Sequence, residues 1–349
     1  YRLYLQQISH QAFKKPGDLV GWMGAMQAQD YPGARWSMGL RLPDTTDAAI
    51  EKAIGEGKIV RTWMMRGTLH FVAQKDIRWM LKLLTPRIIA ASAGRHRQLE
   101  LEETAFSGSK KLFARALRDG RSFTRKEMYA LLEDAGISTA GQRGIHILQR
   151  LCQDGLLCFA SHQEKQPAFA LLEDWLPPGK QLTRDEALAE LTLRYFSSHG
   201  PATVHDFAWW SGLKIADVKA GLDMTASSLR TITIEKTVYW MPREMELPTG
   251  KATKTFLLPG FDEYLLGYKD RSAALDPMHA NKIVPGNNGF FYPTVVIGGR
   301  VVGTWKPVVK KDHITISVAP FAPLSKTQQR AINAATGPYR DFRGTVPVS

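Results

Sequence analysis

Two glutamines, Gln27 and Gln29, stand one residue apart near the amino end of the chain. Side chains two positions apart point about 200° away from each other on a helix, but to the same side of an extended strand. Pro32 disfavours helix at the residue before it, so the helix that begins near Asp18 is expected to end around residues 27–30, where both amides could face one pocket. A glutamine carbonyl can orient a water, and its amide can hold a phosphate or sugar oxygen, although neither is a general base. Taken alone, a pair of polar surface residues is the simpler explanation.

Further polar side chains that could support chemistry follow that pair and recur in a later segment. Asp30 could supply a carboxylate, but on an extended segment it points to the opposite side from the glutamines, so we treat it as a supporting residue only. The segment from Phe261 to Arg271 mixes charged and aromatic side chains, which are Asp262, Tyr264, Tyr268, Lys269 and Arg271. That mixture is typical of a cleft that faces DNA, and equally of a buried ion-pair network between modules. Nothing in the sequence marks Lys269 as a Schiff-base nucleophile, so we expect no lyase chemistry from it.

The sequence predicts no metal site and no cofactor. His70, His199 and His205 are not accompanied by His-x-x-x-His or Cys-x-x-Cys spacing. Two cysteines, Cys152 and Cys158, cannot supply four metal ligands or a disulfide framework. We expect both to pack in a core, in a reducing compartment. There is no phosphate-binding glycine loop of the Walker or dinucleotide kind.

Positive charge is concentrated in one part of the chain. The protein has 46 Lys and Arg against 33 Asp and Glu, a formal net charge of +13. Between Val60 and Lys126 there are 15 basic residues against five acidic ones, so this window alone carries +10. Such a concentration favours a polyanion, because each phosphate that is neutralised releases a counterion. Nucleic acid is therefore the first partner to expect, and a solvated basic surface without a partner is the alternative.

Two hairpins in the sequence carry residues that could contact DNA. Arg61, Arg66 and His70 alternate along the first, in an order that could follow a phosphate backbone. Trp63, Trp209 and Trp210 are expected to anchor cores. A second hairpin turns at two glycines followed by Arg300, a shape slim enough for a minor groove, although an ordinary β-turn explains the glycines as well.

Length and composition indicate a globular protein with more than one core. The 349 residues are 44% hydrophobic and 23% charged, which argues against disordered, collagen-like and disulfide-scaffold proteins. No stretch approaches the run of about 18 apolar residues that spans a membrane, and the chain starts without the apolar core of a secretion signal. We therefore expect an intracellular, cytoplasmic protein associated with the nucleoid.

One order of elements recurs along the chain. Residues 122–172 predict a helix, a turn, a second helix and a two-stranded hairpin, and residues 183–241 repeat that order. At the amino end, a helix over 47–55 precedes a hairpin over 59–72 that turns near Arg66. This order is that of a winged helix. The prediction is an α+β chain of three winged-helix modules and a C-terminal β-rich region that packs on them, with these boundaries: 1–105, 106–180, 181–247 and 248–349.

Four segments, in the correct order and spread over most of the chain, resemble the winged-helix DNA glycosylases of the AlkZ and YcaQ kind. These segments are Met26–Gln29, Arg61–His70, His199–Leu213 and Leu257–Arg271. The family excises bulky N7-alkylated purines and unhooks interstrand crosslinks, on a concave, C-shaped array of winged helices. Its catalytic signature, Gln-x-Gln or Gln-x-Asp, maps onto Gln27 and Gln29 in the Gln-x-Gln version.

The resemblance implies a monofunctional DNA glycosylase that acts on duplex DNA as a monomer. N7 alkylation makes the purine cationic and therefore a good leaving group, so a well-placed water suffices to complete hydrolysis. Neutral bases such as uracil should be poor substrates, because they need acid–base help that two amides lack. Two other functions stay open: a non-enzymatic DNA-binding transcriptional regulator that reads the major groove with the helix over 141–154, and a protein-interaction scaffold.

Overall fold

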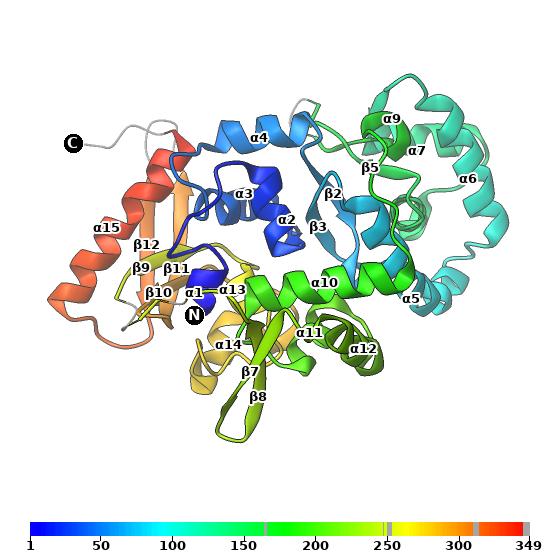
Figure 1. The fold of residues 1–349 in the computed structure, drawn as a ribbon. Coiled ribbons are helices and arrows are strands. Elements are labelled where there is room, and N and C mark those ends of the chain that lie inside the picture. The colour runs from blue at the N-terminus through cyan, green and yellow to red at the C-terminus, as the bar shows by residue number, and fades with distance from the viewer. Residues whose placement is uncertain (164–165, 247, 250–252, 310–313, 345–349) are drawn as a thin grey trace. The chain divides into compact units, whose positions relative to one another are not determined.

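The computed structural model describes residues 1–163, 166–246, 248–249, 253–309 and 314–344. Contacts within the chain divide it into two compact units, shown in Figure 1: unit 1 combines Tyr1–Glu51 with Ala189–Ser349, and unit 2 is Lys52–Leu188. Helices and small sheets occur in both units, which confirms the α+β class. The boundaries of the two units fall inside two of the four expected ranges, 1–105 and 181–247. That each of the four ranges forms its own module stays a prediction. No helix among the described residues is both long and apolar enough to cross a membrane.

Among its described residues, unit 2 contains five complete α-helices, five strands and the ends of two further helices that cross its boundaries. Their bounds are α4 Asp47–Gly55, β2 Ile59–Trp63, β3 Leu69–Ala73, α5 Ile77–Gln98, α6 Glu103–Ala116, β4 Ser122–Thr124, α7 Arg125–Asp134, α8 Arg143–Gln153, β5 Leu157–Phe159, β6 Ala168–Leu171, α9 Leu172–Trp175 and α10 Arg184–His199, with 3-10 turns at Met65–Gly67 and Ala140–Gln142.

The local signals in the sequence of unit 2 correspond to the elements that form. Strands β2 and β3 pair antiparallel, and the chain turns where Arg66 and Gly67 adopt φ of 55° and 73°. Helix α7 begins with a capping box, in which the Thr124 hydroxyl and the Glu127 side chain each bind the other residue's backbone N–H. Strands β4, β6 and β5 then form a sheet in that order. The predicted succession of helix, helix and hairpin over 122–172 is confirmed.

The core of unit 2 lies between these helices and the sheet. Trp63 is 9% exposed and packs on Phe159 and Phe169, with ring centroids 5.0 and 6.2 Å away, so it anchors a core as predicted. Cys152 and Cys158 are free thiols and fully buried. Burial raises the pKa of both, that of Cys158 to about 12, which makes them unreactive packing residues.

Unit 1 is formed by the amino-terminal and carboxyl-terminal parts of the chain. Its elements are α1 Arg2–Leu5, α2 Pro16–Met23, β1 Met26–Gln27, α3 Tyr31–Gly39, α11 Val204–Ser211, α12 Ile215–Thr225, β7 Leu229–Ile234, β8 Thr237–Pro242, β9 Thr255–Leu258, α13 Glu263–Leu266, α14 Ala280–Ile283, β10 Thr294–Ile297, β11 Arg300–Val309, β12 Ile314–Pro320 and α15 Lys326–Arg343, with 3-10 turns at Pro277–His279 and Pro285–Asn287.

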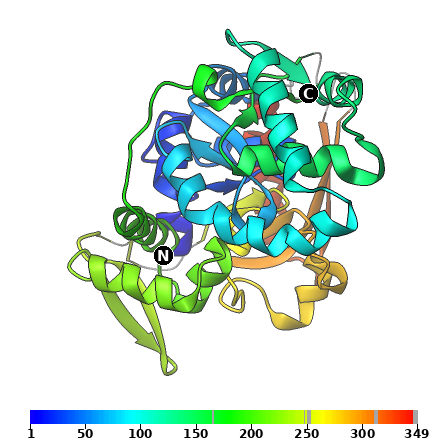
Figure 2. The same ribbon diagram turned by 90° about the vertical axis from the view of Figure 1, so that its right-hand side faces the viewer.

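Helix α11 and the hairpin after it follow the sequence prediction closely. Thr203 and Asp206 form the capping box of α11, and Gly212 ends the helix with φ 76°. Strands β7 and β8 pair antiparallel, and their hairpin extends away from α11 and α12 in both views (Figure 1 and Figure 2). The expected succession over 183–241 is confirmed.

The C-terminal part contains the predicted strands and one helix that was not predicted. Strands β12, β11, β10 and β9 form a sheet in that order, and β10 turns into β11 through Gly298 and Gly299. Helix α15 packs along this sheet, and its Tyr339 places a ring 5.0 Å from that of Trp305 on β11 (Figure 1). A β-rich region was therefore an incomplete prediction. The alternation of apolar residues also predicts a strand over 313–318. Residue 313 lies outside the described residues, and the rest of this range belongs to β12.

Candidate active site

The Gln27 to Asp30 segment lies between two helices and is not helical. Helix α2 ends at Met23, where Gly24 turns the chain with φ 78°. Helix α3 begins at Tyr31 with Pro32 in its first turn, since proline is tolerated where an N–H has no helical partner. The expected non-helical segment is confirmed, but two details of the prediction were wrong. Helix α2 ends before residues 27–30, and Tyr31, where Pro32 was expected to disfavour helix, is the first residue of α3, because proline is compatible with the first turn of a helix. Gln27 is 6% exposed, whereas Gln29 is exposed, so the two amides have different surroundings.

A buried carboxylate, that of Glu263, holds the backbone of this segment. Its Oε1 accepts a hydrogen bond from the Gln27 N–H over 2.8 Å. Its Oε2 accepts from the Trp210 indole N–H over 2.9 Å. Glu263 is 1% exposed and Trp210 is fully buried, as expected of a core tryptophan. Because two donors from different elements converge on one side chain, Glu263 connects β1 with α11 inside unit 1.

His199 lies against the same carboxylate. Its Nε2 is 3.5 Å from Oε2 of Glu263. Ser198 donates its single hydroxyl proton to the Arg194 carbonyl over 2.7 Å, so the 2.8 Å bond between Ser198 Oγ and His199 Nδ1 is donated by the imidazole. Burial lowers the pKa of His199, and the hydrogen bond and charge of Glu263 offset this only in part.

Asp262, the neighbour of Glu263, is engaged in a buried ion pair. Arg41 binds both of its oxygens at 2.8 Å, and the Ser37 hydroxyl donates to Oδ2 over 2.7 Å. Burial alone would raise the pKa of Asp262, but the charge of Arg41 and these hydrogen bonds outweigh it and hold the pKa below the usual value. Of the two interpretations offered for this segment, a cleft that faces DNA and a buried ion-pair network, the second fits Asp262.

The tyrosines of the same segment also bind protein atoms. The Tyr268 hydroxyl donates to the His199 carbonyl over 2.6 Å and accepts from Gln6 Nε2 over 3.0 Å. The Tyr264 hydroxyl donates to the Gly299 carbonyl over 2.7 Å. Burial raises the pKa of Tyr264 to about 12 and that of Tyr268 further, so neither supplies a phenolate at neutral pH.

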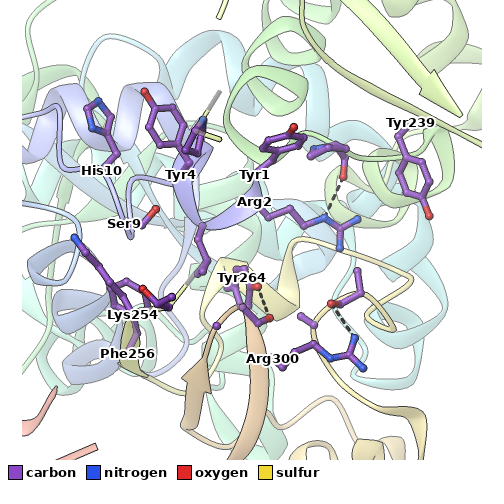
Figure 3. A pocket seen from close by; sticks show the side chains of 18 of the residues that line it. Tyr1, Arg2, Tyr4, Ser9, His10, Tyr239, Lys254, Phe256, Tyr264 and Arg300 are labelled. Carbon is purple, nitrogen blue, oxygen red and sulfur yellow. Dashed lines mark hydrogen bonds between the residues drawn. The ribbon is translucent and has the colours of Figure 1, made fainter. Parts of the chain in front are cut away.

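The basic residues of this region differ in their availability to a ligand. Lys269 is exposed. The Arg271 guanidinium lies 5.0 Å from the Trp209 ring and 4.9 Å from that of Phe291, and desolvation lowers its pKa. Arg300 lines a cavity of about 900 Å³, shown in Figure 3, and donates to the carbonyls of Ser272 and Ala273. Contact of these three residues with DNA stays a prediction.

The first hairpin, in unit 2, buries two of its three candidate DNA-binding residues. Arg61 is 8% exposed, with its guanidinium 5.1 Å from the Phe159 ring, and His70 is fully buried with Nδ1 3.1 Å from the Thr68 carbonyl oxygen. Arg66 is half-buried at the turn. Their roles toward DNA also stay predictions.

Three residues that sequence reasoning missed complete the unit 1 site: Glu263, Arg41 and Gln6. Gln6 donates to the Glu263 carbonyl over 3.2 Å, and its own Oε1 accepts from Arg41 over 3.1 Å. The signal was present in one respect, because Glu263 lies inside a largely apolar segment where a carboxylate needs buried partners. Among the described residues, no cluster of three or more His, Cys, Asp or Glu could hold a metal.

Comparison with known proteins gives one consistent result. Residues 20–342 match the family model described as "DNA glycosylase AlkZ-like". An "Interstrand DNA cross-link repair glycosylase" of Streptomyces sahachiroi is 27% identical over 359 residues, which cover 95% of this chain and 92% of that protein. The solved structure of Streptomyces sahachiroi DNA glycosylase AlkZ superposes with a TM-score of 0.83 at 22% identity, over 100% of this chain and 97% of the other, and so shares the fold.

Proposed function

Because this chain belongs to the AlkZ-like DNA glycosylase family, we propose that it hydrolyses the N-glycosidic bond of N7-alkylated purines in duplex DNA and unhooks interstrand crosslinks formed through them. The observation that carries this proposal is the Gln27–Gln29 element, which lies between α2 and α3 in non-helical backbone held by Glu263. The similar Streptomyces protein, whose name describes cross-link repair, supports the substrate class.

Gln27 and Gln29 position the attacking water in the proposed mechanism. The alkylated purine is already cationic, so its bond to C1′ breaks with the electron pair leaving on the base. A water held by a glutamine carbonyl adds its oxygen to the oxocarbenium-like C1′ and loses a proton to solvent, which leaves an abasic site. Positioning of this kind can contribute about 7 to 11 kcal/mol in ideal cases. Neither glutamine has to act as a base.

Unit 2 provides the basic part of the chain for duplex binding. Its α6, β4, α7, α8, β5 and β6 follow one another in winged-helix order, and the window of +10 lies within it. The regulator alternative needs basic side chains of α8 for the major groove. However, Arg143 donates to the carbonyls of Leu99 and Glu100, and Arg150 binds the Asp154 carboxylate at 3.0 Å. Backbone binding by a monomeric enzyme therefore fits unit 2 better than base readout.

Excision of N7-methylguanine from a duplex tests the proposal. Abasic sites are converted to strand breaks with alkali, and Gln27→Ala and Gln29→Ala are compared with wild type. We expect each substitution to lower the single-turnover rate by about 100-fold, because a poorly placed water forfeits much of the benefit of positioning. Gln329→Ala, at an exposed glutamine of α15, is the matched control and should excise at the wild-type rate.

Different DNA substrates test crosslink unhooking, the requirement for a cationic base and the absence of lyase activity separately. A crosslinked duplex should be unhooked, a uracil duplex should be left intact, and no strand break should form without alkali. Wild-type protein that binds the methylated and crosslinked duplexes but excises neither would support the regulator instead. If Gln27→Ala and Gln29→Ala both excised at the wild-type rate, positioning of the water by the two amides would be ruled out.

A further inference from the structure

The Glu263 carboxylate is placed to fix the backbone of the Gln27–Gln29 element. Its two oxygens accept from two buried N–H donors, at 2.8 Å from the Gln27 backbone and 2.9 Å from the Trp210 indole. The residues that donate are 183 positions apart in the chain, yet both converge on a side chain that is 1% exposed. We propose that Glu263 is a positioning residue of the glycosylase, which sets the Gln27 backbone so that its amide meets the water; this inference rests on the proposed function.

Two acceptor oxygens are required at this position. An ionised carboxylate has only acceptors, whereas a carboxamide has one acceptor oxygen and one donor NH₂. If an amide replaced Glu263, its oxygen could satisfy either Gln27 or Trp210, and its NH₂ would face the other N–H. A buried donor that loses its acceptor pays the full desolvation cost, so the surroundings would shift to relieve it. Glutamine is therefore a sharp probe, because it preserves the size of the side chain and replaces one of its two acceptor oxygens by a donor.

Other buried residues pack around the Glu263 side chain and limit its position. His199 packs its ring on Tyr195, with centroids 4.7 Å apart and planes at 11°, and presents Nε2 to Glu263 Oε2 at 3.5 Å. Trp210 packs 5.1 Å from the same tyrosine ring. The Glu263 backbone is fixed separately by Gln6 and by the Gly267 N–H, which donates to its carbonyl over 2.8 Å. Because packing limits the Glu263 side chain and hydrogen bonds fix its backbone, its Oε1 lies at one defined position relative to the Gln27 N–H.

The test compares Glu263→Gln, Trp210→Phe and the double variant, with Thr225→Val as the matched control. Thr225 is buried in α12 of unit 1, and its hydroxyl donates to the Gly221 carbonyl over 2.8 Å within that helix. Single-turnover excision of N7-methylguanine, Kd for the duplex and the thermal unfolding midpoint are measured for each. Amide hydrogen exchange of the peptide covering residues 24–30 reports the backbone directly.

Glu263→Gln should lower the excision rate by about 10-fold or more, since a misplacement of about 1 Å can cost about 100-fold. Kd for the duplex should stay unchanged, and exchange at 24–30 should become faster. The double variant should excise faster than Glu263→Gln alone, because loss of the indole N–H lets the introduced amide turn its oxygen to Gln27 and its NH₂ to His199 Nε2. Thr225→Val should lower the unfolding midpoint and keep the wild-type rate.

Each other outcome overturns the inference or its premise. A folded Glu263→Gln with the wild-type rate and exchange, or a double variant slower than either single one, would show that Glu263 does not position Gln27. If Glu263→Gln does not fold, Glu263→Asp carries the test, since it keeps two acceptor oxygens on a stem one methylene shorter; an unchanged rate there has the same meaning. Wild-type protein that excises neither the methylated nor the crosslinked substrate would instead remove the proposed function, and a wild-type rate in Gln27→Ala would remove the role of Gln27 on which the inference rests.

Discussion

At the scale of single residues, neighbouring acids on one segment have different partners. Asp262 binds an arginine through both oxygens, whereas Glu263 binds two neutral N–H groups and lies beside a histidine. An arginine fork compensates a buried carboxylate by charge and by paired hydrogen bonds. At Glu263, by contrast, two N–H dipoles point at the two carboxylate oxygens. The first arrangement stabilises unit 1, and the second places one acceptor oxygen against the Gln27 peptide.

Asp262→Ala should therefore destabilise the protein far more than the loss of one hydrogen bond would. Arg41 would remain as an uncompensated buried charge, which typically costs about 3 to 5 kcal/mol of unfolding free energy. Ser37→Ala removes a single donor from the same carboxylate and should cost about 1 kcal/mol. Urea unfolding of the two variants against wild type measures both. Equal losses would show that the ion pair contributes little to stability.

At the scale of elements, helical glycines in unit 2 differ in what surrounds them. A Cβ on Gly144, in the first turn of α8, would lie 2.7 Å from Tyr129 Cζ and 2.9 Å from Thr139 Cβ. A Cβ on Gly94, inside the exposed end of α5, would meet only the flexible end of Arg97 at 4.0 Å. Glycine thus permits the close approach of α7 and α8 in one case and only loosens a helix in the other.

The two alanine substitutions should have opposite signs. Gly144→Ala should lower the unfolding free energy by about 1 to 3 kcal/mol, because the ring of Tyr129 must move out of a packed contact. Gly94→Ala should raise it by about 0.5 to 1 kcal/mol, because alanine loses less backbone entropy in a helix. Thermal unfolding of both variants measures the difference. Stabilisation by Gly144→Ala would mean that the α7–α8 contact is looser than the structure shows.

Helices whose ends carry a capping residue or a terminal glycine could be predicted from the sequence. Helices that tertiary packing stabilises in spite of an internal proline could not. The cap at Thr203 and the glycine at 212 were enough to predict α11. Helices α5 and α15 were not predicted, and each contains a proline, Pro86 and Pro338, which normally ends a helix. Only part of the site could be predicted from the sequence. Gln27 and Gln29 belong to a short motif, whereas the contact between Gln27 and Glu263 joins residues 236 positions apart and has no local signature.

At the scale of the whole molecule, buried imidazoles link stability to pH. Burial is the leading cause that lowers the pKa of three histidines, His96 and His146 in unit 2 and His199 in unit 1, from the ordinary value of 6.5. The net charge of +13 acts in the same direction, since each further proton adds to the repulsion within a basic protein. The lowered pKa of Asp262 matters only below its ordinary value of 3.8, well outside the physiological range.

The protein should therefore lose stability as the pH falls from 7.5 to 5.5. The unfolded chain binds protons at these histidines near pH 6.5, whereas the folded chain binds them only at lower pH, so the unfolded state holds more protons in that window and gains from acid. His199→Asn should flatten the dependence, because asparagine does not titrate and its amide can replace the Nδ1 donor to Ser198. Thr225→Val, which removes a hydroxyl that binds the Gly221 carbonyl within α12, should lower the unfolding midpoint equally at both pH values and leave the slope intact. A midpoint that is constant or rises on acidification would contradict the lowered pKa of these histidines.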